Sequence, residues 1–177
     1  MNKFRHLVLI GLLSLFVAAC SSGGRSTMTP DEYLLHNVSA WNGATEYINR
    51  WLGGEQGEAF TRSLQERKNM KQYAGPLGHA RAELAQVLVQ VQTFPPPEDA
   101  VALRDMTASY LKTADSIYER MQKIAALPDG FSDEQVAPLG AELERLGKDL
   151  ETQMSDLNDA QGAYAKKHGI QLQQSGG

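Results

Sequence analysis

Apolar residues recur at steps of three and four through most of this chain, which is the spacing of one face of an α-helix. The pattern covers four stretches, 30–52, 55–94, 97–126 and 133–168, and no stretch alternates apolar and polar positions as a half-buried strand would. Short connections between long helices favour antiparallel neighbours. We therefore predict an all-α fold over residues 29–169, an elongated antiparallel four-helix bundle in up-down-up-down order.

The first predicted helix has clear signals at both ends. Thr29 can cap its start and Glu32 can close a capping box, with a proline in the first turn, where the missing N–H costs nothing. Gly53 and Gly54 are expected to end it. Its main apolar stripe consists of Leu34, Val38, Trp41, Thr45, Ile48 and Leu52.

The second stretch, 55–94, keeps its helical spacing across Gly75 and Pro76. We predict one long helix with a kink near Pro76, because a proline removes one backbone hydrogen bond and crowds the preceding turn. Two helices joined by a tight corner are the alternative. The basic and acidic residues of this stretch nearly balance, which is typical of a solvated helix face.

The last two helices are predicted from their apolar spacing and their end signals. Over 103–124 the apolar steps alternate between four and three, which is coiled-coil spacing and favours shallow packing against long neighbours. The final helix follows a capping box at Ser132 and is expected to end before Gly169. Gly140 and Gly147 beside its stripe indicate either the close approach of another helix or neutral surface positions.

The chain begins with a segment of a different kind. Lys3 and Arg5 precede an apolar run over 7–19, and small residues come before Cys20; this is the order of a secretion signal. The run is shorter than the roughly 20 residues that a membrane-spanning helix needs. At its end stands a tetrapeptide that resembles the lipobox of bacterial lipoproteins, Val17-Ala18-Ala19-Cys20.

This resemblance implies cleavage between Ala19 and Cys20, a diacylglyceryl group on the Cys20 sulfur and acylation of the new amino group. Ser21, where an Asp would favour retention at the inner membrane, implies the outer membrane of a Gram-negative cell; in an organism with one membrane the same signal implies its outer face. An ordinary secretory signal with Cys20 near the cleavage point is the alternative. The expected organisation is a signal peptide over 1–19, a lipidated flexible tether over 20–28, the bundle over 29–169 and a loose tail over 170–177.

Composition narrows the range of partners. The 177 residues include 17 Lys and Arg against 21 Asp and Glu, which gives a net charge of −4. This mild acidity argues against nucleic acid, which needs a basic patch, and against electrostatic binding to anionic lipid. Cys20 is the only cysteine, so no disulfide within the chain is possible. We therefore expect membrane attachment through lipid on Cys20.

Residues that carry chemistry are sparse in the sequence. The histidines after the leader are His36, His79 and His168, and neither the Glu-x-x-His spacing of di-iron bundles nor a haem-attachment motif occurs. Glu32 with His36, and His79 with Glu83, are four residues apart, but two ligands are too few for a metal site. No nucleotide-binding or hydrolase motif occurs. We expect no enzyme, no metal and no cofactor beyond the covalent lipid.

Aromatic residues of the first helix form the candidate contact surface. Tyr33, Trp41, Tyr47 and Trp51 lie on or beside its apolar stripe, and such side chains suit a groove for a peptide, a partner helix or an apolar ligand. The alternative is a wide core stripe that touches two neighbouring helices.

These features together predict a non-enzymatic interaction or accessory protein of an envelope complex. A pilotin-like escort of an outer-membrane secretin is a variant, by analogy of fold and location. The competing hypothesis is a carrier or sensor of an apolar small molecule, with a pocket near Trp41 and Trp51.

Overall fold

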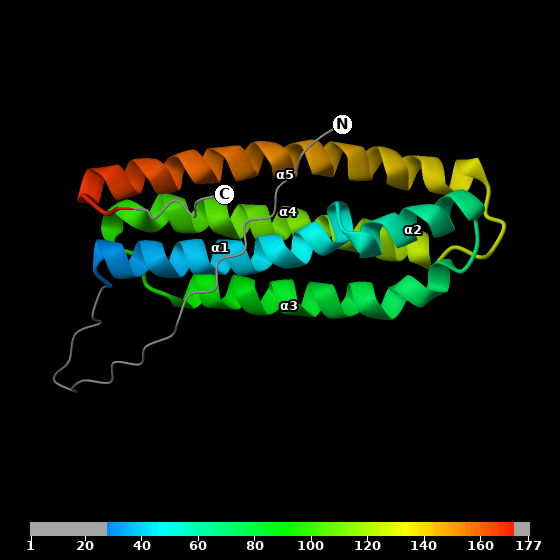
Figure 1. The fold of residues 1–177 in the computed structure, drawn as a ribbon, viewed down its shortest axis with the longest axis horizontal. Helices are drawn as coiled ribbons and strands as arrows, with labels where there is room; N and C mark the ends of the chain where they lie inside the picture. The colour runs from blue at the N-terminus through cyan, green and yellow to red at the C-terminus, as the bar shows by residue number, and fades with distance from the viewer. Residues whose placement is uncertain (1–27, 172–177) are drawn as a thin grey trace.

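The computed structural model describes residues 28–171, which form helices joined by short connections and contain no strand. The elements are α1 (Pro30–Leu52), α2 (Glu55–Glu66), the 3-10 turn η1 (Met70–Tyr73), α3 (Ala74–Thr93), the 3-10 turn η2 (Glu98–Ala100), α4 (Val101–Ala125) and α5 (Asp133–His168). The helices α1, α3, α4 and α5 pack lengthwise against one another, and α2 continues beyond the end of α1 (Figure 1). The predicted all-helical bundle is confirmed for this part of the chain.

Helix ends follow the predicted capping signals. The Glu32 carboxylate accepts hydrogen bonds from the Thr29 backbone N–H at 3.0 Å and from the Thr29 hydroxyl at 2.8 Å. At the start of α5 the Gln135 side chain accepts one from the Ser132 backbone N–H at 2.9 Å. Gly169 ends α5 with a left-handed φ of 67°, which glycine adopts without a steric cost. Both capping boxes and the glycine stop are confirmed.

The predicted single helix over 55–94, kinked near Pro76, is wrong. Arg67 and Asn69 have positive φ values of 55° and 59°, so the chain leaves the helical conformation directly after α2. Pro76 lies in the first turn of α3, where its missing N–H breaks no helical hydrogen bond. The alternative of two helices is correct, but the corner lies at 67–73, before the proline.

This corner is held by the loop between α4 and α5. The Gly130 backbone N–H donates to the Arg67 carbonyl at 2.8 Å, and the Arg67 guanidinium donates to Asp133 at 2.6 Å. The Asn69 backbone N–H donates to Asp129 Oδ1 at 3.0 Å. The bonds from Gly130 and to Asp129 satisfy the Arg67 carbonyl and the Asn69 N–H, backbone groups that the interrupted helix leaves without partners.

A single apolar core runs along the bundle. Residues from every helix contribute to it, and Leu34 of α1, Leu77 of α3 and Leu157 of α5 are at most 1% exposed. The positions predicted from the heptad spacing in α4 are all buried: Leu103, Thr107, Tyr110, Ala114, Ile117, Met121 and Ile124.

Three buried polar side chains form a hydrogen-bonded group inside this core. Asn37 of α1 donates through Nδ2 to the Thr107 hydroxyl of α4 at 2.8 Å, and Gln161 of α5 donates through Nε2 to Asn37 Oδ1 at 2.9 Å. The Thr107 hydroxyl in turn donates to the Leu103 carbonyl at 2.9 Å. Because a shifted helix would leave these groups buried and unpaired, the group sets the register of three helices.

The start of α1, the end of α3, the start of α4 and the end of α5 meet at one end of the bundle (Figure 1). There the His36 ring stacks on Phe94 with centroids 4.6 Å apart. Asp99, before α4, accepts hydrogen bonds from Lys167 and His168, at the end of α5, at 2.6 and 2.9 Å. We call this the α1-start end. The corner at 67–73 lies at the opposite end.

Candidate functional site

The structure separates the four aromatic residues predicted to form a contact surface. Tyr33 and Trp51 belong to the core, with exposed fractions of 2% and 5%, whereas Trp41 and Tyr47 are half-buried. Trp51 packs edge-on against Tyr118 of α4, with ring centroids 6.4 Å apart. The predicted surface is therefore wrong for Tyr33 and Trp51. The wide core stripe describes them instead, because α1 touches α3, α4 and α5.

A small hollow of about 170 Å³ lies beside Trp51, where the end of α1 meets the starts of α2 and α3. Arg50, His79 and Glu83 contribute polar groups to its wall. The Arg50 guanidinium lies 5.2 Å from the centre of the Tyr47 ring, and His79 Nε2 lies 3.2 Å from Glu83 Oε1. The hollow thus combines two aromatic edges with a polar rim and differs from the apolar pocket expected near Trp41 and Trp51.

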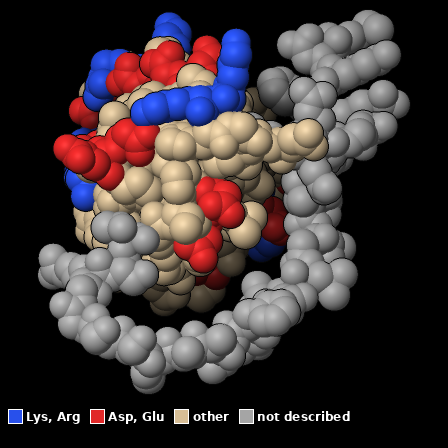
Figure 2. Space-filling view, turned by 90° about the vertical axis from the view of Figure 1, so that its left-hand side faces the viewer, with Lys and Arg blue, Asp and Glu red and all other residues tan. Residues whose placement is uncertain are grey.

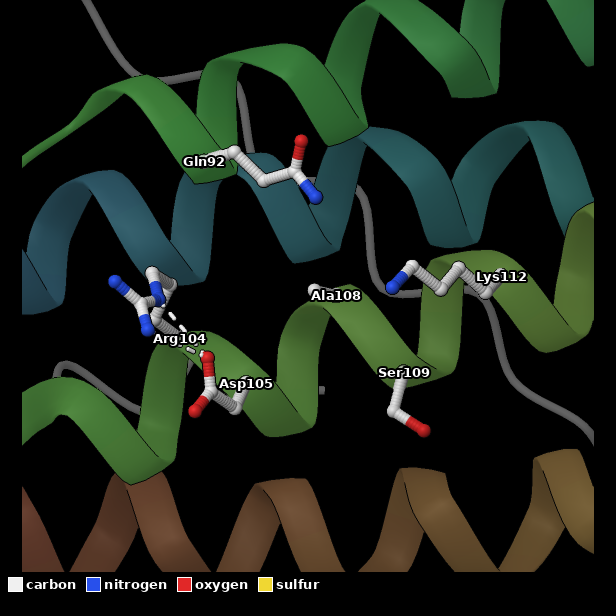
Figure 3. Close-up of a pocket in the computed structure, with 6 residues that line it drawn as sticks. All are labelled: Gln92, Arg104, Asp105, Ala108, Ser109 and Lys112. Carbon is white, nitrogen blue, oxygen red and sulfur yellow. Dashed lines mark hydrogen bonds and ion pairs between the residues drawn. The ribbon is translucent and has the colours of Figure 1, made fainter.

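A larger hollow of about 340 Å³ lies on the outer side of α4, next to the end of α3. The Gln92 amide and the Lys112 amino group point into the space over Ala108, and Arg104 pairs with Asp105 beside it (Figure 3). The Arg104 to Asp105 hydrogen bonds measure 2.8 and 2.9 Å. The positive charge of Arg104 is therefore neutralised by Asp105 within the wall of the hollow. The hollow is open to water, which weakens the electrostatic interactions it can offer.

Burial and ion pairing account for the shifted pKa values of the titratable groups. Burial raises the pKa of Tyr33 to about 12. The hydrogen bond from Lys167 lowers the pKa of Asp99, with a further contribution from His168. Structural ion pairs and core tyrosines produce such shifts as readily as active sites do. Within residues 28–171 no three His, Cys, Asp or Glu side chains gather closely enough to hold a metal ion.

A charge-free surface joins α1 and α3. Residues 33–45 and 84–97 contain no Lys, Arg, Asp or Glu. Because α1 and α3 are neighbours and His36 stacks on Phe94, the two runs lie side by side at the α1-start end (Figure 1). We call the outer surface of both runs the α1–α3 face. Its exposed residues are Leu35, His36, Ser39, Ala85, Gln86, Val89, Gln90, Gln92, Thr93 and Pro95.

This face contrasts with the opposite side of the bundle. Seen from the α1-start end, Lys, Arg, Asp and Glu gather over the upper part of the view, where α5 lies, and the lower part, where α3 lies, is mostly uncharged (Figure 2). Leu35 and Val89 are 68% and 57% exposed. The two charge-free runs are visible in the sequence, but only the packing of α1 on α3 brings them together.

Ala19 and Cys20, the predicted cleavage and lipidation residues, lie outside the described residues. None of the helices between residues 28 and 171 is both long enough and apolar enough to cross a membrane. No protein-family model, curated protein or solved structure matches this chain.

Proposed function

We propose that this protein is a non-enzymatic interaction protein of the bacterial envelope, held at the outer membrane by lipid on Cys20. In this proposal it acts as a scaffold or accessory subunit, with pilotin-like escort as one form of that role. The apolar run that ends at Val17-Ala18-Ala19-Cys20 supports the anchor. The helices form an antiparallel rod in up-down-up-down order, about 54 Å long from the 36 residues of α5.

The observation that carries the proposal is a filled core combined with an exposed charge-free side. The interior is closed by packed side chains, among them Tyr110 and Tyr118 at 1% exposed, and close packing of this kind makes a rigid scaffold. Depletion of charged residues is characteristic of the centres of protein interfaces. In a docking role the packed core keeps the helices in place, and the uncharged side is the surface that a partner contacts.

The test compares the wild-type chain with Cys20→Ser in cells, with Ser22→Ala as the matched control. We expect the wild-type and Ser22→Ala chains to sediment with outer membranes and to accumulate unprocessed when signal cleavage is blocked with globomycin. The Cys20→Ser chain should appear in the soluble periplasmic fraction. After crosslinking in membranes, a partner should be recovered with the wild-type chain and lost with Cys20→Ser. Membrane sedimentation of Cys20→Ser would contradict the anchor.

A carrier of a small apolar ligand is the second candidate; the aromatic edges of Trp51 and Tyr47 in the polar-rimmed hollow are the observation behind it. If the protein is a carrier, titration with a free fatty acid should shift the tryptophan fluorescence of the wild-type chain. Trp51→Phe should lose this response and Trp41→Phe should keep it. A fluorescence spectrum unchanged at saturating fatty acid, with no bound molecule in native mass spectrometry, would exclude this class of ligand.

A further inference from the structure

The helix α2 is held to the rest of the fold by few contacts. It packs on the end of α1 and on η1, and Phe60, at 4% exposed, is the only one of its 12 side chains that is buried. Among the ion pairs found between residues 28 and 171, none involves a residue of α2. An element with so little buried apolar surface opens at a lower free energy than the core does.

The sequence of α2 adds little helical stability of its own. The helix is 12 residues long, and isolated helices of this length are marginal in water. Gly57 lies inside it, and Thr61 and Ser63 also have weak helix propensity. The helical form of α2 therefore depends on the neighbours on which it packs.

Phe60 makes the buried contact between α2 and these neighbours. Its ring packs edge-on against Tyr73 of η1, with ring centroids 5.2 Å apart, and Tyr73 in turn packs edge-on against Trp51 at 6.4 Å. The Ser63 and Tyr73 hydroxyls share a hydrogen bond of 2.9 Å. If α2 left its place, the Tyr73 side chain would lose a ring contact and the partner of its hydroxyl.

The chain on both sides of α2 is attached to the bundle. The end of α1 leads directly into α2, and after α2 the residues Arg67 and Asn69 have left-handed φ values of 55° and 59°. The Arg67 carbonyl accepts a hydrogen bond from the Gly130 N–H, and the Asn69 N–H donates to Asp129. A helix between two fixed ends cannot swing out as a rigid body, so α2 can uncover Tyr73 only by unwinding.

We propose that α2 is an order–disorder strap. Residues 55–66 unfold and refold as one unit while α1, α3, α4 and α5 stay folded, and the unfolded form uncovers the aromatic surface of Tyr73. The strap gives the end of the bundle opposite the α1-start end a closed and an open form. This inference goes beyond the proposed function and does not depend on the lipid anchor.

The strap is compatible with a single unfolding transition of the whole chain. Unwinding of 12 residues exposes much less surface than global unfolding, so its free energy changes little with urea, whereas the free energy of global unfolding falls steeply. The whole bundle therefore unfolds before the open form of the strap becomes populated. The open form is a minor state, and a method that detects minor states is needed to observe it.

The experiment is native-state hydrogen exchange, read residue by residue by NMR, on the full chain carrying Cys20→Ser. The amides of residues 59–66 should exchange with one common free energy, at least about tenfold faster than the slowest amides of α4. Their exchange should also depend less on urea than that of the α4 amides, because strap opening exposes little surface.

Two matched substitutions, each of which removes a large buried apolar side chain, separate strap opening from unfolding of the whole bundle. Phe60→Ala removes the contact that holds α2, so it should speed exchange of the amides of 59–66 about a hundredfold or more. Leu84→Ala, in α3 at 1% exposed, weakens the bundle and should speed the slowest α4 amides at least about tenfold. It should leave the amides of 59–66 within about twofold of their original rate, because α2 and Leu84 contribute to different units.

Three outcomes would overturn the strap. Equal acceleration of the α2 and α4 amides by Leu84→Ala would show that α2 opens only with the whole bundle. Wild-type amides of 59–66 that exchange as slowly as those of α4 would show the same. Widely different rates within 59–66, fastest at the ends of the helix, would mean fraying and not unfolding as a unit. None of these readouts depends on lipid at Cys20, so failure of the proposed anchor and failure of the strap are distinguishable.

Discussion

At the residue scale, Asn37 is the point where the buried hydrogen bonds of the core converge. It donates to Thr107 and accepts from Gln161, so its amide joins α1 to both α4 and α5. All three side chains are at most 4% exposed. Water therefore cannot replace a lost partner, and the cost of breaking the group is set by the desolvated polar atoms that remain.

Replacing Asn37 with Ala should lower the free energy of unfolding by about 2 to 3 kcal/mol, because the Gln161 amide then stays buried without an acceptor. Ser39→Ala, two positions along on the exposed side of α1, is the control and should change stability by less than about 0.5 kcal/mol. Urea denaturation measures both. A loss of similar size in the two variants would show that the buried group contributes nothing special.

The ionisation of Tyr33 makes the free energy of unfolding depend on pH in the alkaline range. Burial raises its pKa from 10.0 to about 12, so between these values the unfolded chain has released the proton that the folded protein still holds. The contribution is complete below pH 10 and is lost as the pH rises toward 12. The free energy of unfolding should fall by about 1.4 kcal/mol per pH unit in this range from Tyr33 alone.

Burial raises the pKa of Tyr110 and of Tyr118 as well, and these two should steepen the fall. Urea unfolding across the alkaline range measures the slope. In the Tyr33→Phe variant the slope should decrease by the contribution of one proton. An unchanged slope in that variant would show that Tyr33 ionises with its ordinary pKa.

At the scale of elements, the joint between α1 and α2 depends on glycine. A Cβ atom built on Gly57 would lie 2.1 Å from the Trp51 carbonyl oxygen, and one on Gly54 would lie 3.0 Å from backbone atoms of Arg50. The first turn of α2 therefore packs directly on the last turn of α1. By contrast, Cβ atoms on Gly140 and Gly147 of α5 would meet nothing within 4 Å. Those two glycines are neutral surface positions, not sites of close helix approach.

Alanine at these two kinds of position should have opposite effects. Gly57→Ala should destabilise the protein by about 1 to 3 kcal/mol, because α2 must move away from α1. Gly140→Ala should stabilise it by up to about 1 kcal/mol, because alanine favours the helix and fits the open space. Thermal and urea unfolding compare the two. If both substitutions stabilised the chain equally, the close joint would be disproved.

At the scale of the whole molecule, one core and one buried polar group connect α1, α4 and α5, while ion pairs such as Arg81 with Asp115 at 2.7 Å connect α3 to α4. No helix of the described part has a core of its own. Unfolding should therefore be a single cooperative transition, as in other small domains with one core.

Both tryptophans lie in α1, which makes the cooperative transition testable. Tryptophan fluorescence reports on α1, whereas far-ultraviolet circular dichroism reports on all helices together. The two urea curves should coincide in midpoint and slope. An earlier fluorescence transition would mean that α1 detaches while α3, α4 and α5 remain folded.

The helical content and most helix ends could be predicted because they depend on neighbouring residues. Thr29 with Glu32, Ser132 with Gln135, and Gly169 act within one turn of the chain, and the three-four spacing in α4 states directly which side is buried. The corner at 67–73 could not be predicted in this way. Its left-handed residues are held by Asp129, Gly130 and Asp133, which are distant in sequence.

The residues of the candidate site also differ in whether they could be predicted from neighbouring residues alone. The predicted leader and the tetrapeptide that resembles a lipobox depend only on neighbouring residues, so the prediction of an anchor at Cys20 needs no knowledge of the fold. The aromatic surface on α1 was predicted from composition, and composition cannot tell a core tyrosine from an exposed one. Tyr33 and Trp51 are buried because α1 packs against three helices, and the same packing leaves Leu35 and Val89 exposed.

The sequence by itself therefore determined the helices, their caps and the heptad positions of α4, since hydrogen bonds and side-chain periodicity within a helix need only nearby residues. Tertiary structure alone decided where the chain turns after α2, which glycines are confined and which uncharged runs lie side by side. The physical reason is that burial and close approach are properties of pairs of elements, and a single helix carries no record of its neighbours.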